Sequence, residues 1–60
     1  MQMMDVQDYA RQLLDAHGLK AIAEAAQKAS TLEAQGDKQQ AQMWRRIEAA
    51  LMEMRGPHAS

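Results

Sequence analysis

Glycine and proline divide this chain into three segments, and that division constrains its fold more than any other feature. Gly18, Gly36 and the pair Gly56 and Pro57 each follow a segment rich in strong helix formers. Glycine just past a helix end adopts a positive φ without strain, and proline prevents a helix from continuing. The sequence therefore predicts three helices, over residues 5–17, 19–35 and 38–55, in a single domain spanning residues 1–60 with a tail at 56–60.

The ends of the first helix carry recognisable signals. Asp5 is a favoured N-cap residue, and Met4 before it is placed to pack on Tyr9 as a hydrophobic staple. If Gly18 closes the helix in a Schellman turn, Leu19 falls where it contacts the preceding turn. The second helix, by contrast, has no obvious N-cap residue.

The boundary between the second and third helices is the clearest in the chain. Gly36 closes the second helix, and Asp37 with Gln40 three residues later forms a capping-box pattern at the start of the third. A connection this short forces the two helices to lie antiparallel and adjacent. The sequence therefore predicts an all-α fold, a small three-helix chain dominated by an antiparallel αα-hairpin.

Helical periodicity indicates which faces of the helices meet. Apolar residues at a 3, 4, 3 spacing form one stripe on each helix of the hairpin. The stripe of the second helix is small: Ile22, Ala25, Ala29 and Leu32. The stripe of the third helix is large: Trp44, Ile47, Leu51 and Met54. Small residues opposite large ones allow close packing, and the first helix offers a third stripe to lay across the hairpin.

A chain of 60 residues buries only about 60% of the surface that its unfolded form exposes, so its core is marginal. Since it has no cysteine and only two histidines, we expect neither disulfides nor a structural zinc site to stabilise it. Regular helix packing and association with another chain are the remaining sources of stability. Both are expected here.

Charge and hydropathy argue against two classes of partner. The formal net charge of −1 is unlike that of proteins that hold nucleic acid by neutralising phosphates. No apolar run is long enough to span a bilayer, and the first ten residues lack the pattern of a signal peptide. We therefore expect a cytoplasmic protein with no membrane partner.

The side chains that could carry chemistry are scattered. His17 lies at a helix end, where the helix dipole favours a cation, so a capping role is favoured over catalysis. The carboxylates occupy caps and outer faces, and Glu24 and Lys28 are spaced for an i, i+4 ion pair. A metal or small-molecule site between the helices is an alternative, but it lacks a cluster of ligands. We expect no enzymatic activity, no cofactor and no metal.

The stretch MWRRIE holds the only tryptophan, Trp44, followed by Arg45 and Arg46. It could be a stacking platform for nucleic acid, a hot spot for a protein partner, or the largest plug in a small core. On a helix, Trp44 and Arg46 diverge by about 200°, so a core-facing ring leaves Arg46 outside. Glu48 is spaced to pair with Arg45. A solvated charged face is therefore favoured, ahead of an arginine that binds a partner.

Two resemblances add to this reading. The segment AEAAQKASTLEAQGDKQQAQMWRRIEAAL loosely resembles the helix-turn-helix units of tetratricopeptide and microtubule-interacting modules, although the Trp, Leu-Gly and Tyr positions of the first tetratricopeptide helix are not filled. YARQLLDAHG, AEAAQKA, WRRI and MRGPHAS together resemble a group of short uncharacterised bacterial helical proteins. The first resemblance implies a protein-binding architecture, and the second transfers no activity.

These observations predict a non-enzymatic interaction or regulatory module that forms a homodimer and has no identified protein partner. The hairpin presents more apolar surface than one interface can cover, because Met43 and Ala50 lie beside the large stripe. The alternative is a nucleic-acid-associated protein that uses Arg45, Arg46 and Arg55, with Lys38. The candidate interaction residues are Trp44, Met43, Ile47, Leu51, Met54, Arg45 and Arg46.

Overall fold

The protein is all-α, as predicted. The computed structural model describes residues 5–55, so Met4 and the tail at 56–60 lie outside the described residues. Helix α1 spans Val6–His17, α2 spans Lys20–Ala34 and α3 spans Lys38–Arg55. The observed bounds lie within one residue of the predicted ones. In this part of the chain, no helix is long and apolar enough to cross a membrane.

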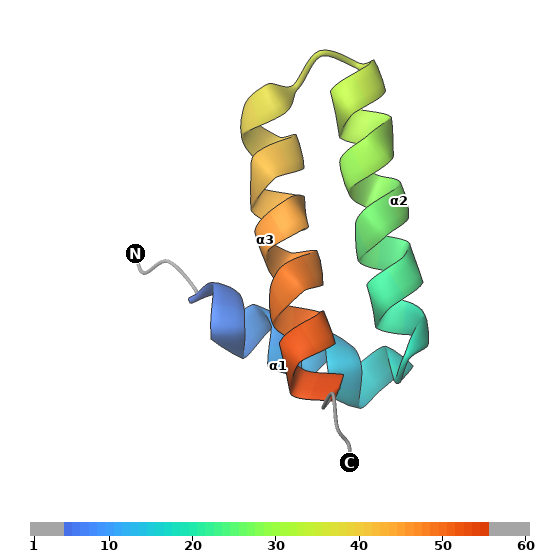
Figure 1. Ribbon diagram of the computed structural model, residues 1–60, viewed down its shortest axis with the longest axis vertical. Helices are drawn as coiled ribbons and strands as arrows, with labels where there is room; N and C mark the ends of the chain where they lie inside the picture. The colour runs from blue at the N-terminus through green and yellow to red at the C-terminus, as the bar shows by residue number, and fades with distance from the viewer. Residues whose placement is uncertain (1–4, 56–60) are drawn as a thin grey trace.

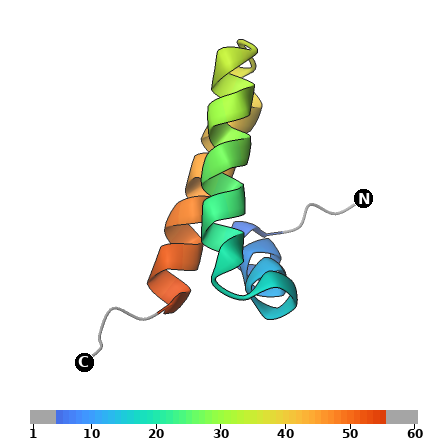
Figure 2. The ribbon, with the colours of Figure 1, turned by 90° about the vertical axis from the view of Figure 1, so that its right-hand side faces the viewer.

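Helices α2 and α3 stand antiparallel and side by side, and a short turn joins them at one end of the molecule (Figure 1). Helix α1 crosses the other end of this hairpin. The view turned by 90° shows α1 displaced to one side of the hairpin (Figure 2). The end of the hairpin near the turn is therefore a two-helix layer, while the opposite end has a third helix packed on it.

The hairpin turn is a complete Schellman motif. Gly36 has a φ of 85°, its N–H donates to the Glu33 carbonyl at 3.0 Å, and the Asp37 N–H donates to the Leu32 carbonyl at 2.9 Å. The Asp37 carboxylate then accepts the Gln40 N–H at 3.2 Å and caps α3. Only this half of the capping box forms, because the Asp37 N–H is already bound within the Schellman motif.

The first turn differs from the prediction. Gly18 has a positive φ of 67°, and its N–H donates to the Leu14 carbonyl at 2.8 Å. Its ψ of −150° lies outside the left-handed helical region, so the chain leaves in a different direction from a Schellman turn. Leu19 is 63% exposed, so it gains little burial beside the preceding turn.

Helices α1 and α2 both begin without a side-chain capping hydrogen bond. Asp5 occupies the N-cap position of α1 and its carbonyl accepts the Tyr9 N–H at 3.0 Å, but its side chain makes no capping hydrogen bond. As its sequence suggests, α2 has no side-chain cap. The N–H of Ala21 instead donates to the Gly18 carbonyl in a tight i, i−3 bond at 3.0 Å.

The buried core consists mostly of alanine. Of the eight buried apolar residues, six are alanines, and Leu51 is the only large side chain less than 2% exposed among residues 5–55. The buried residues are Ala10, Ala21, Ala25, Ala29, Ala41, Ile47, Ala50 and Leu51. Larger apolar residues pack around them but remain partly exposed: Val6, Tyr9, Leu13, Leu14, Ile22, Trp44 and Met54.

This core corrects the predicted stripes. The buried stripe of α2 is Ala21, Ala25 and Ala29, whereas Ile22 is only partly buried. Alanine at every fourth residue suits close helix packing, and the bulkier Ile22 packs against the core with part of its side chain exposed. Ala50, expected among the surplus apolar surface, is only 4% exposed and belongs to the same core cluster as Ala10 of α1.

Candidate interaction surface

Trp44 lies where all three helices meet. Its ring contacts the ring of Tyr9 from α1 in an edge-to-face arrangement, with a centroid separation of 5.9 Å and an interplanar angle of 72°. The ammonium nitrogen of Lys28 from α2 lies 5.7 Å from the Trp44 ring centroid. Trp44 is nevertheless only partly buried. It therefore packs between α1 and the hairpin, and part of its side chain remains in contact with solvent.

Lys28 and Glu24 do not form the ion pair expected from their spacing. Lys28 lies over the Trp44 ring, and Glu24 instead lies 3.4 Å from the Nδ1 atom of His17, an ion pair when His17 is protonated. The contact between α1 and α2 brings His17 to Glu24, which the sequence spacing of α2 alone could not reveal. His17 thus occupies the last turn of α1, where the helix dipole favours a cation.

Arg45 joins the two helices of the hairpin on its exposed face. Its Nε and Nη2 atoms donate to the two carboxylate oxygens of Glu33 at 3.4 and 3.3 Å, and its Nη1 atom donates to Glu48 at 3.1 Å. The hydrogen bonds to Glu33 and then to Glu48 raise the pKa of Arg45 above its ordinary value. The expected pair with Glu48 is present, and Glu33 adds a fork-like contact across helices.

Two carboxylates therefore neutralise Arg45, the first arginine of the alternative nucleic-acid surface. Arg46 and Arg55 are exposed. None of the ion pairs among residues 5–55 involves either of them.

The apolar candidates divide into core and surface. Ile47 and Leu51 are 2% and 0% exposed, so in this fold they serve the core. Met54 and Trp44 are partly buried. Met43 is 52% exposed, and among residues 5–55 it is one of three exposed large apolar side chains, with Met52 at 48% and Leu19 at 63%. Of the predicted apolar set, Met43 is therefore the residue most available to a partner.

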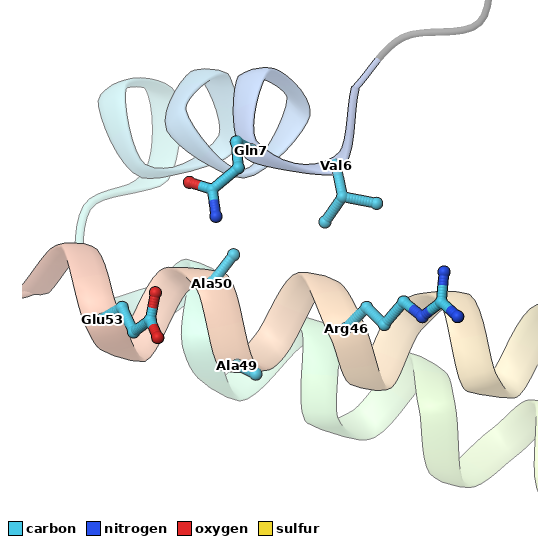
Figure 3. Close-up of a pocket in the computed structure, with 6 residues that line it drawn as sticks. All are labelled: Val6, Gln7, Arg46, Ala49, Ala50 and Glu53. Carbon is cyan, nitrogen blue, oxygen red and sulfur yellow. The ribbon is translucent and has the colours of Figure 1, made fainter.

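A shallow groove of about 270 Å³ runs between the start of α1 and the C-terminal half of α3. Val6 and Gln7 line it from α1, and Ala49 and Ala50 line it from α3. Figure 3 shows Ala50 directed toward α1 and Ala49 at the other edge of the α3 ribbon. Arg46 and Glu53 flank these alanines along α3, one toward each end. Of these residues, the sequence analysis named only Arg46 as an interaction candidate and Ala50 as surplus apolar surface, because only the packing of α1 against α3 creates the groove.

Another shallow depression lies near the hairpin turn. It is lined by Glu33, Lys38, Ala41 and Gln42. Glu33 is already bound by Arg45 at its edge. Within residues 5–55, no group of three or more histidine or acidic side chains could hold a metal ion. Among residues 5–55, the groove between α1 and α3 and the exposed side chain of Met43 beside Trp44 are candidate interaction features.

Comparisons with protein-family models, curated proteins and solved structures gave no match to the chain.

Proposed function

We propose that this protein is a non-enzymatic helical interaction module that associates with a second copy of itself. The observation that carries this proposal is the composition of the core. Six of the eight buried apolar residues in the described range 5–55 are alanines, while Leu19, Met43 and Met52 are roughly half or more exposed. An alanine side chain removes little apolar surface from water, so this core contributes less to stability than a core of leucine and isoleucine.

Association with a second copy would add stability that the alanine-rich core does not provide. A domain of this size has little stability to spare, and burying partly exposed side chains against a partner adds to it. A symmetric dimer is the commonest homo-oligomer and needs no second kind of protein.

The experiment is sedimentation velocity of the full chain across a dilution series from low to high micromolar concentration. We expect the mass to rise with concentration from that of the 6.7 kDa chain toward twice that value. Circular dichroism at each concentration serves as the control, because it shows whether a change in mass accompanies a change in helix content. A single 6.7 kDa species at every concentration would contradict self-association.

A further inference from the structure

We propose that the groove between α1 and α3 is the dimer contact, and that its occupant is helix α3 of a second copy, antiparallel to the first. This inference rests on the proposed self-association and specifies one contact for it. The contact includes none of Leu19, Met43 and Met52, and its partly buried apolar side chain is Val6. Its support is the arrangement of four residues along α3: Arg46, Ala49, Ala50 and Glu53.

The two charges form a self-complementary pair. Arg46 and Glu53 are seven residues apart, which is two helical turns and about 10.5 Å along the axis of α3. Figure 3 shows them at opposite ends of the α3 side of the groove. A two-fold axis midway between them reverses the direction of the second helix. Arg46 of one copy then faces Glu53 of the other, at both ends of the contact.

The centre of the same contact is occupied by small side chains. The two-fold axis passes between Ala49 and Ala50, and Ala49 is exposed while Ala50 is buried beneath α1. Alanine at the crossing point lets two helix axes approach toward the lower end of the 8–10 Å range. Because α1 already covers Ala50, Ala49 is the small exposed side chain that a second α3 can approach closely.

Helix α1 provides the other side of the groove. Val6 and Gln7 project toward α3 across the groove (Figure 3), so a helix lying there contacts both α1 and α3 of the first copy. Val6 is a partly buried apolar residue that would gain burial, and Gln7 can hydrogen-bond at the rim. In a two-fold dimer the same patch of both copies forms the contact, so each of these interactions occurs twice.

The test is the dimer dissociation constant, measured by sedimentation equilibrium for wild type, Arg46→Glu, Glu53→Arg and the double variant R46E/E53R. Each single reversal places like charges opposite each other at both ends, so the dissociation constant should rise by about tenfold or more. The double variant restores opposite charges and should return to within a few-fold of wild type. Arg11→Glu, on the exposed face of α1, is the charge control and should leave the constant unchanged.

A steric pair of variants tests the crossing point independently of charge. Ala49→Gln keeps a good helix former but enlarges the side chain at the two-fold axis, so it should weaken the dimer. Ala23→Gln makes the same change on the exposed face of α2 and should have no effect. Circular dichroism confirms that each variant retains its helices.

The possible outcomes separate the two proposals. A wild-type protein that stays monomeric overturns both self-association and this contact. A wild-type dimer that neither single reversal weakens, or that the double variant fails to restore, overturns only the groove and leaves self-association standing. In that case the exposed edge at Met43 and Trp44 becomes the surface to test.

Discussion

At the scale of the residue, Gly36 determines where the hairpin turns. Its φ of 85° lies in a region that side chains with a β-carbon rarely adopt, although a β-carbon built there meets no atom within 4 Å. The cost of substitution is therefore backbone strain rather than a clash. We expect Gly36→Val to lower the free energy of unfolding by roughly 1–2 kcal/mol, measured by urea denaturation.

The neighbouring residue provides the control. Gln35 is in the right-handed helical region, with φ −83° and ψ −5°, so Gln35→Val should cost only a few tenths of a kcal/mol in helix propensity. Equal losses for the two variants would show that positive φ at Gly36 is not what the turn requires.

Trp44 is the second residue whose role can be measured directly. Trp44→Ala removes the ring that contacts Tyr9 and Lys28. Because the ring is only partly buried, we expect a loss of about 3 kcal/mol, the low end for aromatic-to-alanine changes in cores. Met52→Ala, at a side chain that is 48% exposed, should change the stability by less than about 0.5 kcal/mol. Similar values for both would place Trp44 outside the structural core.

At the scale of the element, two helices begin after aspartate but are capped differently. The Asp37 carboxylate accepts a backbone N–H of α3, whereas the Asp5 side chain makes no such bond at α1. Asp37→Ala should therefore cost about 1 kcal/mol of unfolding free energy, and Asp5→Ala distinctly less. Thermal unfolding of the two variants makes the comparison. A larger loss for Asp5→Ala would contradict the capping geometry described above.

Signals local in sequence predicted the elements well. Glycine after a helix, and aspartate before one, act through their own backbone and their nearest neighbours, so Gly18, Gly36 and Asp37 marked the boundaries from sequence alone. The turn at Gly18 shows the limit. Its positive φ was predictable, but the ψ that turns Leu19 into solvent depends on where α1 packs.

Contacts between helices were much less predictable, because they depend on interaxial distance and rotation. Periodicity placed Ile22 on the buried stripe, yet the stripe of α2 that is buried begins at Ala21. The fork from Arg45 to Glu33 and the position of Lys28 over Trp44 join residues on different helices. The groove at Arg46 and Glu53 is likewise formed by both α1 and α3, so the residue spacing within α3 alone could not predict it.

At the scale of the whole molecule, the arrangement leaves the hairpin unequally covered. Helix α1 packs across the end far from the turn, and the end near the turn has only two helices (Figures 1 and 2). Because the core is mostly alanine, the chain's stability is expected to depend on a second copy as well as on that core. For such a protein, the free energy of unfolding includes a contribution from association that grows with concentration.

The most direct test of this account is the midpoint of thermal unfolding of the wild-type chain, followed by circular dichroism over about a thousandfold range of concentration. Folded chains associate with each other, and unfolded chains do not. The midpoint should therefore rise by several degrees from the lowest to the highest concentration. The double variant R46E/E53R should show the same rise, and Arg46→Glu should show a smaller one. A wild-type midpoint that stays constant across the whole range would contradict the claim that folding and self-association are coupled.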